Sequence, residues 1–159
     1  MTATPRNPDL VAPVSLDLRL PRSVEAPGLA RRALRRWMAG VAGTDELVDD
    51  ATLVVSEAVT NAVVHACSAP RLVVDVVRIR LRIEVHDTSR EPPVMRGSSA
   101  AVGGRGLRIL AAVADAWGWS MTSTGKLVWT EQRLVAPDAP RPRPGPSVRP
   151  PGRDGMRLG

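Results

Sequence analysis

The feature that most constrains the fold is a pair of runs rich in β-branched residues, at residues 72–77 and 79–85, that are separated by a single residue. The second run alternates apolar and polar residues as I-R-L-R-I-E-V. Strict alternation predicts a strand with one buried and one solvated face, and the short connection predicts an antiparallel hairpin. The connecting residues Val77, Arg78 and Ile79 include neither the glycine nor the asparagine that a tight hairpin turn prefers.

Two helix patterns that precede the hairpin supply a covering layer for its apolar face. Residues 15–20 alternate as S-L-D-L-R-L and predict a first strand. We expect a helix that begins at Ser23, as its N-cap, and ends near residue 40. A second helix is expected to begin after Thr44, a good N-cap residue, and to extend to about residue 66.

The chain after the hairpin predicts one more helix and two more strands. Residues 88–102 form an expected loop, residues 107–114 a short helix, and residues 117–122 and 126–134 two strands. The resulting order is β, α, α, β, β, loop, α, β, β. This order predicts an α+β fold, a two-layer sandwich in which helices pack on one face of a mainly antiparallel sheet.

The sequence divides into three parts. Residues 1–13 are polar and rich in proline and are expected to form a flexible leader. Residues 14–134 carry all of the periodic segments and are expected to form one domain. Residues 135–159 contain seven prolines, and this composition predicts a disordered tail rich in proline and arginine.

Charge and composition narrow the range of functions. The net charge of +6 is a weak indication of nucleic-acid binding, because five arginines against two aspartates in residues 135–159 supply half of it. No element that would read nucleic acid accompanies the charge, so no direct nucleic-acid partner is expected. The single cysteine excludes an internal disulfide. No apolar run reaches the roughly 18 residues of a membrane span, and we expect a cytoplasmic protein.

A row of polar residues on the second helix is the first candidate for chemistry. Glu57, Asn61 and His65 recur every four residues and therefore lie along one helical face. When the row is considered alone, a solvated polar stripe is the better explanation, and the features that follow in the chain favour a functional role. His65, at the end of the helix, is as suited to capping the helix C-terminus as to a functional role.

Two further features follow in the chain. Asp87 ends the alternating strand, where a carboxylate is able to accept a hydrogen bond from an exocyclic amine such as that of adenine. The run Gly103-Gly104-Arg105-Gly106-Leu107 leads directly into a helix. Glycines let the backbone approach phosphate oxygens, and a helix N-terminus presents free N–H groups to them. The run is neither a Walker motif nor a dinucleotide-binding fingerprint.

Together, in this order and spacing, these features resemble the GHKL superfamily of ATPases and kinases. The text E-L-V-D-D-A-T-L-V-V-S-E-A-V-T-N-A-V-V-H-A and the ending G-G-R-G-L are similar to those of the anti-sigma regulatory factors, which are small serine/threonine kinases. The resemblance covers roughly residues 14–134. It implies the histidine-kinase-like ATPase fold and ATP with Mg²⁺ as ligands.

The resemblance also implies roles for individual residues. Asn61 holds the magnesium ion, and Glu57 accepts the proton of an attacking serine or threonine hydroxyl. Asp87 binds adenine, and Gly104 and Gly106 bind the phosphates.

The remaining residues of the glycine turn belong to the same expected site, Arg105 as an electrostatic helper and Leu107 at the start of the helix. Two positions depart from the pattern of the superfamily. Thr88 and Ser89 stand where glycines usually follow the adenine aspartate. Lys126 follows Gly125 where a threonine normally supports the adenine.

The implied partners are an anti-anti-sigma protein of the STAS type, as the phosphorylated substrate, and a sigma factor, and a homodimer is compatible with the resemblance. Two alternatives remain open. One is a nucleotide-dependent module that sequesters its partner without phosphorylating it. The other is a nucleic-acid-binding protein that uses the arginines of the tail.

Overall fold

The computed structural model describes residues 15–41, 43–93 and 105–134. The expected leader 1–13, the expected tail 135–159 and the glycines Gly103 and Gly104 lie outside the described residues. The elements follow the order expected from the sequence: β1 (Leu16–Arg19), α1 (Ala26–Met38), α2 (Asp45–Val64), β2 (Arg71–Val77), β3 (Arg80–Asp87), α3 (Arg105–Val113), β4 (Ala116–Thr122) and β5 (Gly125–Arg133).

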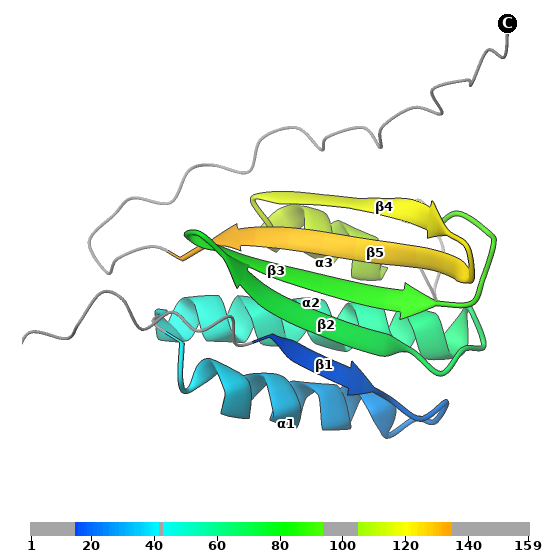
Figure 1. The fold of residues 1–159 in the computed structure, drawn as a ribbon, viewed down its shortest axis with the longest axis horizontal. Coiled ribbons are helices and arrows are strands. Elements are labelled where there is room, and N and C mark those ends of the chain that lie inside the picture. The colour runs from blue at the N-terminus through cyan, green and yellow to red at the C-terminus, as the bar shows by residue number, and fades with distance from the viewer. Residues whose placement is uncertain (1–14, 42, 94–104, 135–159) are drawn as a thin grey trace, which may run out of the picture.

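The five strands form one sheet in the order β1-β2-β3-β5-β4, and every neighbouring pair is antiparallel. Figure 1 shows the sheet with the helices behind and below it. The predicted α+β sandwich is therefore confirmed. The exchange of β4 and β5 in the order places the end of β3 directly beside the start of β5, where Asp87 is paired with Lys126.

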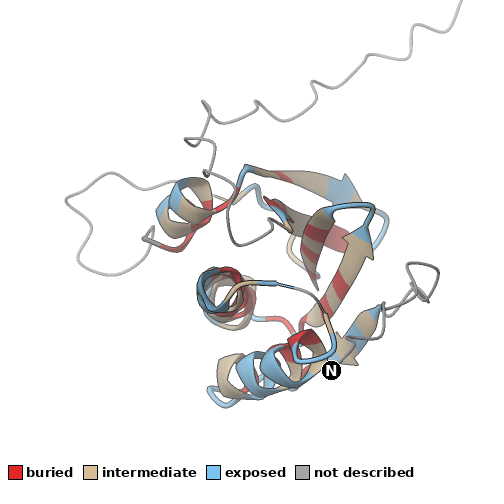
Figure 2. Ribbon diagram, turned by 90° about the vertical axis from the view of Figure 1, so that its left-hand side faces the viewer, coloured by how far each residue is buried: buried red, intermediate tan, exposed pale blue. Residues whose placement is uncertain are grey.

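The hydrophobic core lies between the sheet and the three helices, on one face of the sheet (Figure 2). Alternate residues are buried in β3, as the period of two predicted, and in the first half of β2. The core joins Leu72, Val74, Leu81, Ile83 and Val85 of the strands to Leu34, Val54, Val55, Val59 and Leu110 of the helices. None of the helices in the described ranges is long and apolar enough to cross a membrane.

The cap of α2 agrees with the sequence analysis, and the start of α1 does not. The Thr44 side chain accepts a hydrogen bond from the backbone N–H of Leu47 at 3.2 Å. The first helix begins at Ala26, with Glu25 as its N-cap, so the expectation that Ser23 caps it is wrong. The hydroxyl of Ser23 instead accepts from the backbone N–H of Glu25 and forms a turn ahead of the helix.

The β2–β3 hairpin turns without glycine. Arg78 takes a positive φ of 59°, a conformation that costs a residue with a side chain about 1–2 kcal/mol. Seven paired positions on either side hold the turn, from Arg71↔His86 to Val77↔Arg80. The pairing of the strands therefore imposes this turn, which the local sequence does not favour.

The outer face of the sheet carries a chain of ion pairs. Arg82 pairs with Glu84 and with Glu131, both at 2.8 Å, and Glu84 contacts His86 at 3.1 Å. Burial alone would raise the pKa of Glu84, but hydrogen bonds from Arg82 and His86 outweigh it and hold the pKa below its usual value. Arg82 also lies 4.7 Å above the ring of Trp129. This face is polar and half-buried, which explains why it needs no second layer of helices.

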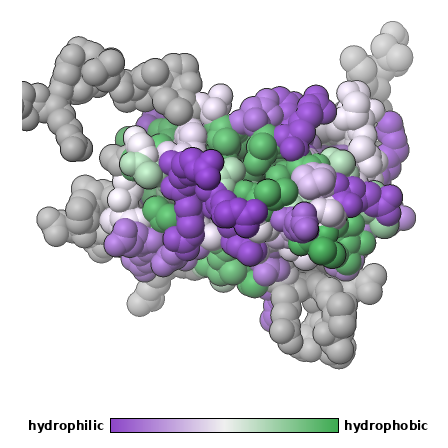
Figure 3. Space-filling view, turned by 90° about the horizontal axis from the view of Figure 1, so that it is seen from below, coloured by the Kyte–Doolittle hydropathy of each residue, from purple (hydrophilic) through white to green (hydrophobic). Residues whose placement is uncertain are grey.

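The face that carries α1 is shown in Figure 3, where hydrophilic and hydrophobic side chains are interspersed. The four arginines of this helix are exposed, and two of them are held by α2: Arg31 donates to Ser56 and Arg35 to Asp49, each at 2.8 Å.

Candidate functional site

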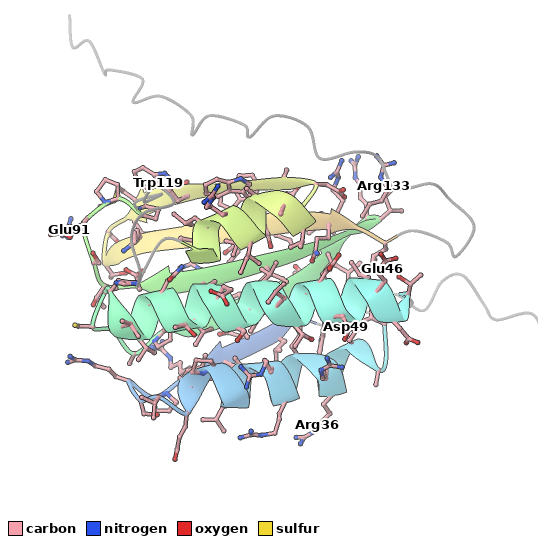
Figure 4. The ribbon with its side chains drawn as sticks, turned by 180° about the vertical axis from the view of Figure 1, so that it is seen from behind. Arg36, Glu46, Asp49, Glu91, Trp119 and Arg133 are labelled. Carbon is pink, nitrogen blue, oxygen red and sulfur yellow. The ribbon has the colours of Figure 1, made fainter. Side chains whose placement is uncertain are left out.

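A cavity of about 200 Å³ lies at the C-terminal end of α2, between α2, α3 and the adjoining ends of β3 and β5. Glu91, one of its lining residues, is at the opposite end of the molecule from Glu46 in the first turn of α2 (Figure 4). Eight of the described lining residues are apolar and six are polar or charged. The lining residues are Ala58, Asn61, Ala62, His65, Val85, Asp87, Ser89, Glu91, Pro92, Pro93, Leu107, Leu110, Lys126 and Val128.

The polar row of α2 meets the first turn of α3. Glu57 and Asn61 are both partly buried, and Gly106 lies directly against them. A Cβ atom at Gly106 would stand 2.6 Å from Nδ2 of Asn61 and 3.2 Å from Oε2 of Glu57. Only glycine therefore lets the start of α3 approach these two side chains so closely. The structure brings together three of the residues that the sequence placed in one site.

Asp87 is buried at the end of β3, with 8% of its surface exposed, and it lines the cavity. Its Oδ1 accepts hydrogen bonds from the backbone N–H of Ser89 at 2.8 Å and from Nζ of Lys126 at 3.0 Å. Within the described residues both hydrogen bonds end on Oδ1, so Oδ2 remains an acceptor for a ligand. Its neighbour Ser68 is buried and accepts from the backbone N–H of Thr88 at 3.2 Å, which fixes the end of the strand.

Lys126 is the unexpected member of the site. It is 6% exposed and forms a buried ion pair with Asp87 across the β3–β5 register. Gly125, the residue before it, lies against the backbone of Asp87 and Thr88, and a Cβ there would be 2.6 Å from Cα of Thr88. The close approach of Gly125 to β3 is what sets Lys126 beside the carboxylate.

The glycine turn is only partly described. Arg105 is the first residue of α3, and the structure says nothing of its side chain, while Gly104 lies outside the described residues. Leu107 is buried and lines the cavity, so it forms part of an apolar wall. The N-terminus of α3 is next to Asn61, through the contact with Gly106.

His65 is exposed at the C-cap of α2, where its backbone N–H bonds to the carbonyl oxygen of Asn61 at 2.9 Å. Its position agrees with the capping interpretation, although the residue also lines the cavity.

The residues present fit an adenine nucleotide and a magnesium ion. The apolar walls and the free oxygen of Asp87 suit a purine base, and Asn61 with Glu57 offers hard oxygen atoms of the kind that Mg²⁺ prefers. No group of three or more His, Cys, Asp or Glu side chains within the described ranges could hold a metal by itself. The cavity is smaller than the roughly 300–1,000 Å³ of typical small-molecule sites, so its described part fits the base better than a whole triphosphate.

Sequence reasoning missed several members of the site. Ser68 and Ser89 support the end of β3, and small side chains such as Ala58 and Ala62 open the wall of the cavity. The alanines stand beside the polar row in the sequence, at positions that a strict core pattern fills with larger residues. The pairing of Lys126 with Asp87 depends on β5 lying next to β3, which no local pattern indicates.

Comparisons with known proteins bear on the family and the fold of the chain. A profile of the family described as histidine kinase-like ATPase domain matches residues 20–131, more than half of the chain. Among solved structures, the chain is similar to the crystal structure of the RsbU and RsbW domains of a Mycobacterium tuberculosis protein, with a TM-score of 0.62 and 20% identity. The match covers 77% of this chain and 33% of that chain, so the two share a fold over about a third of the larger chain. No curated protein matches the chain in a sequence comparison.

Proposed function

The chain belongs to the histidine kinase-like ATPase family, and from this premise we propose that it binds Mg-ATP and transfers the γ-phosphoryl group to a serine or threonine of an anti-anti-sigma protein. The observation that carries the proposal is the contact of Gly106 with both Asn61 and Glu57. It joins the polar row of α2 to the N-terminus of a helix, which is a favourable position for phosphate groups.

Each residue of the site has a distinct task in this proposal. The carboxylate of Asp87 accepts a hydrogen bond from the amine of adenine through its free Oδ2, and Leu107 contributes to the apolar wall around the base. The first turn of α3, from Gly104 to Gly106, holds the phosphates through its backbone N–H groups, with Arg105 adding positive charge.

Asn61 holds Mg²⁺ through its amide oxygen. When bound, the ion neutralises charge that develops on the phosphate oxygens during transfer. Glu57 lies one helical turn before Asn61 and contacts the same glycine, so it is positioned to accept the proton of the attacking hydroxyl. General-base catalysis of this type accelerates a reaction by about 10²–10⁴-fold.

The partners follow from the resemblance in sequence and from the fold shared with an RsbW domain. The substrate is an anti-anti-sigma protein of the STAS type, and the other client is a sigma factor. In this account the protein acts in the cytoplasm by binding proteins, and direct contact with nucleic acid has no role. Association into a homodimer is compatible with the same site.

A second candidate is a nucleotide-dependent module that sequesters its partner without phosphorylating it. The departure from the superfamily pattern after Asp87, where Thr88 and Ser89 stand in place of the usual glycines, favours this alternative. Glu57 beside Asn61 favours the kinase, since a module that only binds has no need of a base at that position.

A transfer assay with three proteins tests the proposal. The wild type, Glu57→Ala and Asn61→Ala are each incubated with labelled ATP, Mg²⁺ and candidate anti-anti-sigma proteins from the same genome. We expect the wild type to label one of them, Glu57→Ala to bind ATP nearly as well but to transfer about 10²–10⁴-fold more slowly, and Asn61→Ala to lose both. A wild type that binds ATP and labels no candidate supports the sequestering module. Transfer by Glu57→Ala at the wild-type rate would show that Glu57 is not the base.

A further inference from the structure

Lys126 is the only lysine in the sequence, although the chain has 22 lysine and arginine residues in total. Lysine is almost never buried without a partner, and here the single lysine is 6% exposed and lies in the wall of the cavity. A compact ammonium group with three donors fits a small space into which the broader guanidinium of an arginine would not fit. The position of this residue therefore calls for an explanation in terms of the cavity.

Stability alone is a poor explanation for the ion pair. Removing two charges from water costs free energy that their attraction only partly restores, so a buried ion pair contributes little to stability compared with apolar side chains of similar size. The apolar pair Val85 and Val128 lies two positions away on the same two strands and also lines the cavity. An additional apolar pair would have continued this wall without the cost of desolvation.

The hydrogen bonds of the pair leave one acceptor and one donor side by side. Asp87 uses Oδ1 for both Lys126 and the N–H of Ser89, so Oδ2 has no partner within the described residues. Lys126 has three N–H donors and uses one of them on Asp87. Both side chains line the cavity, where a ligand would meet an acceptor next to a charged donor.

This arrangement matches one edge of adenine. The exocyclic amine at C6 is a donor, and the neighbouring ring nitrogen N1 is an acceptor. A 6-oxopurine such as hypoxanthine reverses the order, with a carbonyl acceptor at C6 and an N–H donor at N1. Proteins that read bases commonly bond to these edges, and a charged donor makes such a hydrogen bond stronger than a neutral donor does.

We propose that Lys126 is a specificity-determining residue that donates directly to N1 of adenine while Asp87 accepts from the neighbouring amine. The inference rests on the proposed function, since it requires the adenine of ATP to lie against Asp87. The ion pair then holds both groups in position before the base binds. It presents a complementary edge to adenine and an opposed edge to a 6-oxopurine in the same pose.

The test removes the acceptor from the ligand and the donor from the protein. Affinities of the wild type for ATP and for 1-deaza-ATP, in which a C–H group replaces N1, are measured by calorimetry, with inosine triphosphate as the mismatched base. We expect the wild type to prefer ATP over 1-deaza-ATP by about 10- to 150-fold, the range for a hydrogen bond that involves a charged group. In Lys126→Met the preference should disappear, because the donor to N1 is gone. Each protein is compared only with itself, so a general change in affinity does not affect this result. In Lys126→Gln, which keeps a neutral donor, it should be about 2- to 10-fold.

A second measurement uses the wild type alone and does not depend on the folding of a variant. Isotopic labelling of lysine gives one side-chain NMR signal, because the sequence has one lysine. The ammonium signal of Lys126 should shift when ATP binds and should shift much less with 1-deaza-ATP.

The outcomes distinguish this inference from the function on which it rests. Equal affinity of the wild type for ATP and 1-deaza-ATP would overturn the role of Lys126 and leave nucleotide binding intact. Tighter ATP binding by Lys126→Met than by the wild type would also overturn it, because Lys126 would then compete with the base for Asp87. If the wild type binds none of the three nucleotides, the proposed function itself fails.

Discussion

At the scale of the residue, two glycines determine the geometry of the site because they lack a Cβ atom. Gly106 permits α3 to approach Asn61 and Glu57, and Gly125 permits Lys126 to approach Asp87. Both glycines adjoin a residue to which we assign a role in binding. The site therefore depends on the absence of a Cβ atom at Gly106 and Gly125 as much as on its polar side chains.

The first prediction concerns Gly106→Ala. A Cβ at this position would stand 2.6 Å from Nδ2 of Asn61, so the side chain of Asn61 or the start of α3 has to move. A displacement of about 1 Å in a functional site is able to cost about 10²-fold, and we expect the affinity for Mg-ATP to fall by about 10-fold or more.

Gly28→Ala is the matched control, because Gly28 also lies in a helix and its Cβ would meet only Arg32 at 3.4 Å and Arg31 at 3.8 Å. Alanine is better than glycine in a helix by about 1 kcal/mol, so this control should gain stability and bind ATP as the wild type does. Unchanged ATP affinity in Gly106→Ala would contradict the account of the contact.

The second prediction concerns the stability of the buried ion pair. Asp87→Asn leaves Lys126 charged and unpaired in the wall of the cavity, and breaking a buried pair in this way costs about 3–5 kcal/mol. Adding Lys126→Met to Asp87→Asn removes the unpaired charge of Lys126, so the double variant should regain most of the lost free energy of unfolding. Chemical denaturation of the wild type, both single variants and the double variant measures the coupling. A loss below about 1 kcal/mol in Asp87→Asn would mean that Lys126 is not held by Asp87.

At the scale of the element, periodic patterns predicted the fold well because they depend on burial of one face. The alternation in β3 and the cap at Thr44 both follow from neighbours in the sequence. Three features required the tertiary structure. The turn at Arg78 is imposed by strand pairing, α1 begins three residues after Ser23, and Lys126 meets Asp87 only because β5 lies beside β3. The residues of the candidate site were predicted by resemblance, and their roles remain predictions.

The third prediction uses the ion pairs on the outer face of the sheet. The pKa of Glu84 is lowered from 4.5 in the folded protein, where hydrogen bonds from Arg82 and His86 overcome the opposing effect of burial. A lowered pKa in the folded state stabilises the protein above the unfolded value, and the contribution disappears as the pH falls through the folded value. Glu84→Gln should therefore cost about 1 kcal/mol or less near pH 7 and less than that near about pH 3, below the unfolded pKa, where the contribution of the charge is being lost. Urea denaturation at both pH values measures the difference. A cost that is equal at the two would show that the charge of Glu84 is not responsible.

At the scale of the whole molecule, the described core is built from residues between Leu16 and Leu134. The sheet and the three helices bury their apolar faces against one another, and the cavity lies at one end of this core. The arginines of residues 135–159 supply much of the positive net charge. The domain that we propose, residues 14–134, accordingly contains every residue to which a role is assigned.

The fourth prediction is that removal of residues 136–159 changes neither the melting temperature nor the affinity for ATP. Thermal denaturation and calorimetry of the truncated and full-length proteins measure both. A fall of about 5 °C or more, which corresponds to a contribution on the order of 1 kcal/mol, would make the tail a structural part of the domain. Binding of DNA by the full-length protein at physiological salt, lost on truncation, would favour the nucleic-acid alternative.

The most direct test of the central claim is calorimetric titration of the wild type and Asn61→Ala with ATP in the presence of Mg²⁺. Thr60→Ala is the matched control, because Thr60 precedes Asn61 on α2, bonds to the carbonyl oxygen of Ser56 at 2.7 Å and does not line the cavity. We predict that the wild type and Thr60→Ala bind ATP with the same affinity, that both depend on Mg²⁺, and that Asn61→Ala binds at least about 10-fold more weakly. Asn61→Ala binding Mg-ATP as tightly as the wild type, or a wild type that binds no ATP, would contradict the account.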